Sequence, residues 1–444
     1  MKRVVTLDFL RGVAIYMVIL SHVFIYVVDP NILNPETGSI FILILLAPLI
    51  FLGKWKGFFL MISAASQIYS MYIGFQGEKK PIIVFVKQLV NAFLLLVVAY
   101  IFKIYLLLGG TLYQYIFFSI WNPAARLNSL QFSDTLESIA LCRIINAIIF
   151  YFLTLGKGIK KPYRNIIIFG FLCLLSIALT PVIVQWVFIR TGYTPLNIQS
   201  TIVNTWKERS YLMFLANLIG WQEPLFPFVS SAFFGAMYGI IFTQHSLPRK
   251  TFLRTAFFIS LGLVVVGLGL LPFTDNFIDD MWTHIHVPWM LFVNLGVQSM
   301  CFLISMHLIE FNPNNEKAVR RLRYFRRFGM VTLSIFCMEL VDLIPRWIFS
   351  LIFKQDFITG STANIGILFL LVIFALAFWS GIIRLWEVVR FYGSLEWFLQ
   401  MVTSLIFWKK LNLKDPLNLK QILYDVEAIS FLEKAQHSLE GTHV

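Results

Sequence analysis

Three ionisable residues stand in the first apolar segment of the chain, TLDFLRGVAIYMVILSHV. Arg11 and His22 are eleven residues apart, almost three full turns of an α-helix, so both face the same way about 16 Å apart along the axis. Asp8 and Asp29 fall close to the same line. Ionisable groups within a membrane span are costly and usually face a cavity or a partner, so this face predicts a site. An interfacial Asp8–Arg11 pair and one satisfied histidine explain the same residues equally well.

The composition indicates a polytopic helical membrane protein. The chain has 444 residues, of which 58% are hydrophobic and 13% are charged. A soluble domain is about half apolar and about a quarter charged. The net charge is +13, but the basic residues stand in short loops between apolar segments, as the positive-inside rule produces, so we expect no nucleic-acid partner. The four cysteines lie within apolar segments and are expected to be small core residues.

The apolar segments predict an all-α fold of ten transmembrane helices. The expected spans are 6–28, 57–75, 82–107, 134–155, 164–188, 223–243, 251–272, 287–309, 328–352 and 362–388. The run 39–53 is short for crossing a bilayer and predicts a re-entrant or interfacial helix. The lysine- and arginine-rich segments then fall on one side, so both termini are expected in the cytoplasm. Residues 1–404 are the predicted membrane domain, and 405–444 are a cytoplasmic polar tail with an amphipathic helix.

The first span also carries a resemblance. The motif LDFLRG, then nine residues and a histidine, resembles the first span of the transmembrane acyltransferase superfamily, which includes the acyltransferase-3, YeiB-like and heparan-α-glucosaminide N-acetyltransferase families. Further stretches resemble later parts of the family in the same order: KGFFLMISAASQIYS, DTLESIALCRII, EPLFPFVSSAFFGAMYGIIF, FGMVTLSIFCMEL and YGSLEWFLQMVT. The chain departs from the family at four positions: Glu339 replaces a histidine, Phe336 a tyrosine, Ser394 a proline and Gln400 an arginine.

The resemblance implies an acyltransferase of the cell membrane. Its donor would be acetyl-CoA or another acyl-CoA from the cytoplasm, bound near Arg11 and Asp8. His22 would be the catalytic residue, as a general base or an acyl carrier, and Asp29 or Glu339 would orient it. The acceptor would be a hydroxyl or amine of an extracytoplasmic sugar or glycan. The resemblance leaves the oligomeric state open, including a homo-oligomer.

Other polar residues within the expected spans have both functional and structural readings. Arg143 and Asn146 are three residues apart and share a helix face, so they could hold a phosphate or amide of the donor, or pair with a neighbouring helix. For Asp342 and Arg346, four residues apart, we favour an ion pair. Lys103, like Lys87, is expected to extend towards a membrane interface.

The segment DDMWTHIH is the remaining candidate for chemistry. Asp279, Asp280, His284 and His286 fit no standard ligand spacing, so no metal is expected. His284 and His286 are also the nearest equivalents of the loop histidine that the heparan-type enzymes use. Two other functions fit the same residues: a multi-span transporter of a small polar or anionic substrate, and a non-catalytic protein on the same scaffold.

Overall fold

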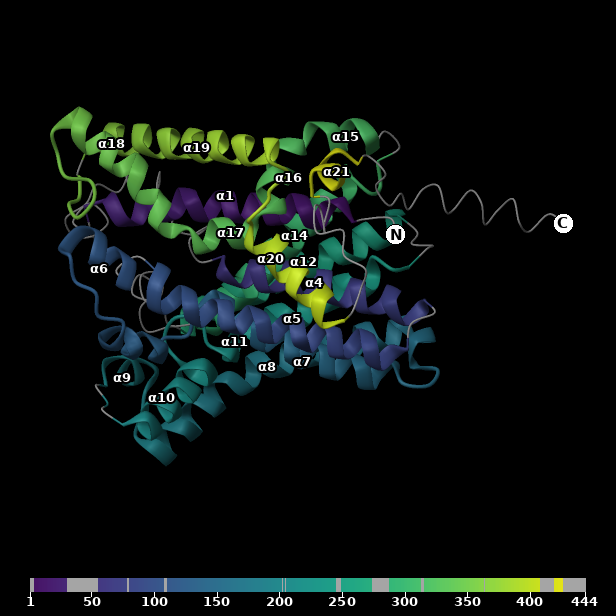
Figure 1. Ribbon diagram of the computed structural model, residues 1–444. Helices are drawn as coiled ribbons and strands as arrows, with labels where there is room; N and C mark the ends of the chain where they lie inside the picture. The colour runs from purple at the N-terminus through teal and green to yellow at the C-terminus, as the bar shows by residue number, and fades with distance from the viewer. Residues whose placement is uncertain are drawn as a thin grey trace.

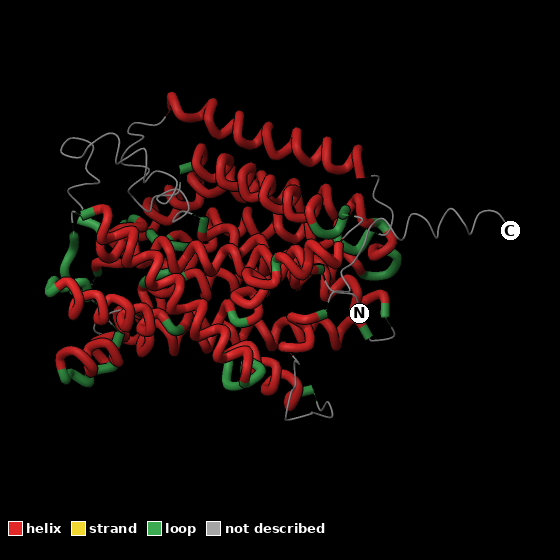
Figure 2. Tube along the Cα trace, turned by 90° about the horizontal axis from the view of Figure 1, so that it is seen from above, coloured by secondary structure: helices red, strands yellow, loops and turns green. Residues whose placement is uncertain are grey.

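The protein is an all-helical bundle over the part of the chain that this computed structural model describes. These residues are 4–29, 55–77, 80–107, 110–201, 203, 205–244, 249–273, 287–312, 315–362, 364–407 and 419–425. Within them there is no β-strand, and one isolated backbone bridge joins Val28 to Thr362. Figures 1 and 2 show the long helices packed side by side. The expected helical class is confirmed.

Eight helices of the described chain are long and apolar enough to cross a membrane. They are α1 (Val5–Val27), α4 (Lys56–Gln76), α5 (Pro81–Ile101), α7 (Thr135–Thr154), α8 (Pro162–Thr191), α12 (Arg249–Leu270), α14 (Pro288–Leu308) and α19 (Ile365–Val388). Each coincides with an expected span, and the chain is a multi-pass membrane protein.

Two of the ten expected spans are not single long helices. The span 223–243 is the shorter helix α11 (Leu225–Ile241). The span 328–352 is broken into the end of α16 (Arg323–Met330), then α17 (Thr332–Cys337), a 3-10 turn η5 (Glu339–Asp342) and α18 (Leu343–Phe353). A continuous apolar run shows how much chain is buried in the membrane but not where its helix breaks.

Both described ends of the chain lie at one end of the bundle, which we call the terminal face (Figure 1). It carries the start of α1, the turn η3 (Gly158–Lys160), α15 (Asn315–Arg321) and α21 (Leu419–Tyr424). The opposite end, the far face, carries several other short elements: η1 (Phe102–Leu106), α6 (Thr111–Phe118), η2 (Ala124–Gln131), α9 (Pro195–Ser200), α10 (Trp206–Ile219) and η4 (Leu271–Phe273).

Helices α1 and α4 are antiparallel, so the end of α1 and the start of α4 both lie at the far face. Arg11 and Ile62 line one cavity, whereas His22 and Lys56 line another. The expected re-entrant run 39–53 lies between these helices, outside the described residues.

A pair of glycines brings α1 and α16 into backbone contact. A Cβ on Gly12 would lie 1.8 Å from the carbonyl oxygen of Phe325, and one on Gly329 would lie 2.0 Å from that of Asp8. Only residues without a Cβ permit so close a crossing. The contact places Arg11, next to Gly12, beside α16.

The described part of the predicted tail packs under the bundle. Helix α20 (Leu395–Ile406) precedes it, and α21 lies against α16. Arg326 donates from Nη2 to the carbonyl oxygen of Ile422 at 3.0 Å, and the Arg323 guanidinium lies 4.4 Å from the ring centre of Tyr424. These contacts hold α21 to the terminal face.

Candidate functional site

Two of the cavities in the bundle are lined by residues of the expected site. The first, the arginine cavity, has a volume of about 390 Å³, and its polar lining includes Arg11, Asn91, Arg143, Glu396 and Gln400. The second, the histidine cavity, has a volume of about 320 Å³, and its polar lining includes Ser21, His22, Tyr26, Lys56, Asp134, Gln222, Glu223 and Glu339. Both volumes are in the range of small-molecule sites.

The arginine cavity receives guanidinium groups from two helices. Arg11 on α1 has its Nη1 atom 3.7 Å from Oδ1 of the buried Asp8, and its side chain is 31% exposed. Arg143 on α7 donates from Nη2 to Oε1 of Gln88 at 3.2 Å. Two guanidinium groups at one cavity favour an anionic ligand with phosphate or carboxylate groups.

Asn146 is not brought to this cavity. Its side chain is fully buried, and neither its Nδ2 nor its Oδ1 atom has a hydrogen-bond partner among the described residues. Of the expected donor-binding residues, the structure therefore brings Arg11 and Arg143 together, with Asp8 behind Arg11, and leaves Asn146 in the packed interior.

The histidine cavity holds an imidazole beside a carboxylate. The Nδ1 atom of His22 lies 3.5 Å from Oε1 of Glu339. The His22 side chain is 35% exposed and that of Glu339 is 5% exposed, so the imidazole is open to the cavity while the carboxylate lies behind it. Tyr26, one turn after His22, donates its hydroxyl to the same Oε1 atom at 3.1 Å. The 3.5 Å separation is longer than a hydrogen bond, but it places a carboxylate beside a side chain that can transfer a proton.

Asp29, the other expected orienting carboxylate, is placed elsewhere. Its backbone N–H donates to the carbonyl oxygen of Thr362 at 3.1 Å, next to the bridge between Val28 and Thr362. Asp29 is not among the residues that line the histidine cavity. Of the two expected carboxylates, only Glu339 lies beside His22.

The predicted ion pair between Asp342 and Arg346 does not form among the described residues. Asp342 instead accepts a hydrogen bond from Nε1 of Trp379 at 2.5 Å, and the Arg346 guanidinium lies 4.9 Å from the ring centre of Tyr26. The prediction was wrong because each of the two side chains contacts a different helix instead. Asp342 directly precedes α18 and stands one turn before Arg346, but its carboxylate is bound to Trp379 of α19 and the guanidinium packs on Tyr26 of α1.

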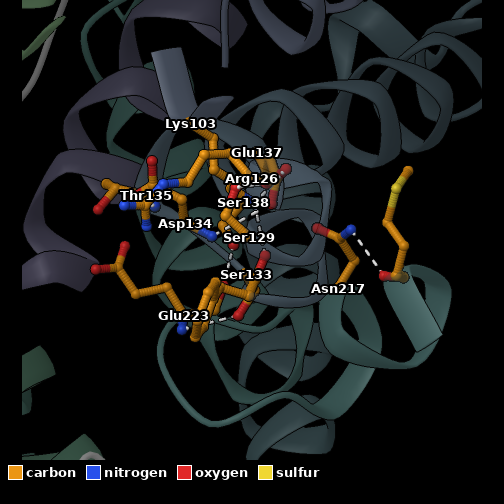
Figure 3. A network of polar contacts seen from close by, with 12 residues as sticks. Lys103, Arg126, Ser129, Ser133, Asp134, Thr135, Glu137, Ser138, Asn217 and Glu223 are labelled. Carbon is orange, nitrogen blue, oxygen red and sulfur yellow. Dashed lines mark hydrogen bonds and ion pairs between the residues drawn. The ribbon is translucent and has the colours of Figure 1, made fainter. Parts of the chain in front are cut away.

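A second charged pair lines the histidine cavity, and the sequence reasoning missed it. Lys56, at the start of α4, has its Nζ atom 2.9 Å from Oε1 of Glu223. The Glu223 backbone is held from both sides: its N–H donates to the Ser133 hydroxyl at 3.0 Å, and its carbonyl accepts from the Ser138 hydroxyl (Figure 3). Nothing in the local sequence links Lys56 to Glu223, whereas the one-turn spacing of Tyr26 from His22 could have been noticed.

The buried pair of Lys103 and Glu137 corrects another expectation. Lys103 does not extend to an interface: its side chain is 2% exposed, and its Nζ atom lies 2.6 Å from Oε1 of Glu137 (Figure 3). It also donates to the carbonyl oxygen of Phe132 at 2.5 Å. The backbone widens into the π-helical turn η1 at this point, and Glu137 belongs to the capping box at the start of α7, so a carboxylate is within reach of the lysine.

The two cavities share part of their walls. Phe59 of α4, Thr135 of α7 and Phe336 of α17 line both of them. The arginine pair and the imidazole–carboxylate pair thus lie on opposite sides of one thin partition made by three helices.

The described residues contain no cluster of three or more histidine, cysteine, aspartate or glutamate side chains that could hold a metal ion. The segment with Asp279, Asp280, His284 and His286 lies outside the described residues.

Fold and cavities together define a helical multi-pass membrane protein with a polar interior site. Comparisons of the chain with protein-family models, with curated proteins and with solved structures found no match.

Proposed function

We propose that the protein is a membrane acyltransferase that moves an acyl group, by resemblance acetyl, from acyl-CoA to a hydroxyl or amine. One observation carries the proposal: a cavity with two arginines and a cavity with a histidine–carboxylate pair share a wall. An acyl group that reaches this wall from the arginine side needs to move only across the partition to reach the histidine side.

The arginine cavity is the proposed donor site. Coenzyme A carries several phosphate groups, and a guanidinium binds a phosphate through two parallel hydrogen bonds. Arg11 and Arg143 would hold this end of the donor, and the thioester would lie at the shared wall. The terminal face is then the cytoplasmic face, in agreement with the basic loops that flank its helices.

The histidine cavity is the proposed acceptor site. Because Nδ1 of His22 faces Glu339, Nε2 is the nitrogen left to take a proton from the acceptor. The carboxylate stabilises the imidazolium that forms. The far face is then extracytoplasmic, and the acceptor is a sugar or glycan outside the cell membrane.

Titration calorimetry of the purified protein with coenzyme A tests the donor site. We expect Arg11→Ala to weaken binding roughly 10- to 100-fold, since a hydrogen-bonded charge pair is lost. Arg11→Lys keeps the charge without the bidentate geometry and should recover part of the affinity. Arg320→Ala is the matched control, because Arg320 is exposed on α15 and pairs with Glu316. Equal affinity of the wild type and Arg11→Ala would contradict the proposal.

A transporter is the second candidate, because two of the three side chains between the cavities are phenylalanines, which could form a gate in a transport pathway. Flux assays in proteoliposomes distinguish the two functions. A transporter would move solute across the bilayer without acyl-CoA, whereas the proposed enzyme would release free coenzyme A in proportion to the acylated acceptor.

A further inference from the structure

The partition between the two cavities has one polar member. The side chains of Phe59 and Phe336 contain no polar atom, whereas that of Thr135 carries a hydroxyl. Any reacting group that spans both cavities must pass these three side chains. A hydrogen bond from the partition to such a group can therefore come from only one of them, Thr135.

Thr135 is held rigidly at the start of α7. Its backbone N–H donates to Oδ1 of Asp134 at 2.6 Å, and Asp134 forms a capping box with Glu137. Glu137 is fixed in turn by its buried pair with Lys103. The backbone of Thr135 is therefore anchored by its own cap and by a neighbouring helix, which is the support that a preorganised site needs.

The hydroxyl of Thr135 makes no hydrogen bond with any of the described residues, although the residue is only 5% exposed. Two other buried threonines bond within their own helix: Thr154 donates to the carbonyl oxygen of Phe150 at 2.8 Å, and Thr180 to that of Ser176 at 2.7 Å. The Thr135 hydroxyl does not belong to the fully buried polar atoms without a partner, so it is accessible from the cavities that Thr135 lines and can bond to a group held there.

We infer that Thr135 is a catalytic residue whose hydroxyl donates a hydrogen bond to the carbonyl oxygen of the acyl thioester. The inference rests on the proposed function. Charge develops on this oxygen when the acceptor attacks, and a fixed donor at that point stabilises the transition state more than the ground state.

The reaction step balances with groups already placed. The acceptor oxygen or nitrogen forms a bond to the thioester carbonyl carbon while His22 takes the acceptor's proton. The carbonyl oxygen, bonded to Thr135, carries the negative charge of the tetrahedral intermediate. When the carbonyl re-forms, the carbon–sulfur bond breaks and coenzyme A leaves as a thiolate. The thiolate then receives the proton from His22. Phe59 and Phe336 keep water from the thioester.

The test is the turnover of acetyl-CoA by Thr135→Val, which removes the hydroxyl and keeps the branched shape. We expect kcat to fall about 10²- to 10³-fold, as on loss of one oxyanion donor. The affinity for coenzyme A and the melting temperature should be unchanged. Thr135→Ser should stay within about tenfold of the wild type, since it restores the donor. Thr154→Val, on the same helix but away from both cavities, is the matched control and should keep full turnover.

The results distinguish a failure of the role of Thr135 from a failure of the proposed acyltransferase function. An active wild type with an equally active, folded Thr135→Val would overturn the role of Thr135 and leave the acyltransferase proposal standing. A wild type that binds coenzyme A but transfers no acyl group to any sugar acceptor would overturn both. If Thr135→Val fails to fold, Thr135→Ala removes the same hydroxyl with a residue that suits the first turn of a helix. Unchanged kcat in that variant would overturn the role equally.

Discussion

His22 and Glu339 meet in the histidine cavity, with Nδ1 of the imidazole 3.5 Å from Oε1 of the carboxylate. The contact joins α1 to the 3-10 turn η5, at the point where an apolar segment near the end of the chain ceases to be one helix. Tyr26 donates to the same carboxylate oxygen. The break in the helix and the orientation of the histidine are thus one structural feature.

Glu339→Gln should reduce acyl transfer by at least about tenfold, since an orienting carboxylate contributes up to ~10⁴ to kcat in other base–carboxylate pairs. The glutamine keeps the size of the side chain but loses the charge that stabilises an imidazolium. Steady-state kinetics and calorimetry on the same preparation give kcat and the affinity for coenzyme A. Tyr26→Phe is the graded comparison and should have a smaller effect, because it removes one hydrogen bond. Unaltered kcat in Glu339→Gln would show that the contact is structural.

Substitutions of Lys103 and Glu137, which form a buried pair, should have non-additive effects on the melting temperature. Removing either partner leaves a charge in the interior, and such changes typically cost about 3–5 kcal/mol. We expect Lys103→Met and Glu137→Gln each to lower the melting temperature, and the double variant to recover much of the loss. Scanning calorimetry in detergent measures all four proteins. Additive losses in the double variant would mean that the two residues do not interact.

The crossing of α1 and α16 predicts a steric limit at its glycines. Gly12→Ala and Gly329→Ala place a methyl group against backbone carbonyls, and such overpacking costs about 1–3 kcal/mol or more. Gly262→Ala on α12 is the control, since its Cβ would meet nothing within 4 Å. We expect thermal stability to fall for the first two variants and to hold or rise for the third. A stable Gly12→Ala protein would be incompatible with this packing.

Glu310 should make stability depend on pH. It lies two residues beyond α14 and accepts hydrogen bonds from the backbone N–H, at 2.9 Å, and the hydroxyl of Thr6. Burial raises the pKa of its carboxyl from 4.5 to about 7, against the opposing effect of these hydrogen bonds. A raised carboxyl pKa means that the protonated form stabilises the fold. This contribution is complete below pH 4.5 and is lost as the pH rises through about 7.

The matched measurement for Glu310 compares melting temperatures of the wild type and Glu310→Gln across that range. The wild type should lose stability relative to the variant between about pH 4.5 and pH 7, because there the carboxyl ionises in the unfolded chain but stays protonated in the folded one. Parallel curves for the two proteins would contradict the assignment.

The helical class could be predicted because hydropathy and span length are local properties of the sequence. The shared face of Arg11 and His22 is local too, since it follows from helical spacing alone. The contact of His22 with Glu339 could not be predicted, because it depends on a helix break within a uniformly apolar segment. The partner of Lys103 could not be predicted either. Its sequence context indicates an interfacial lysine, and only the tertiary fold brings Glu137 to it.

The central claim is that His22 transfers the acceptor's proton, and turnover and melting temperature of His22→Ala, measured on the same purified sample, test it most directly. Losing a general base typically costs roughly 10²–10⁴-fold in rate. We predict that loss, with folding and affinity for coenzyme A nearly intact. His307→Ala, at the exposed end of α14, is the control. His284→Ala and His286→Ala should have smaller effects. A His22→Ala protein that melts earlier but keeps its turnover per folded molecule would contradict the account.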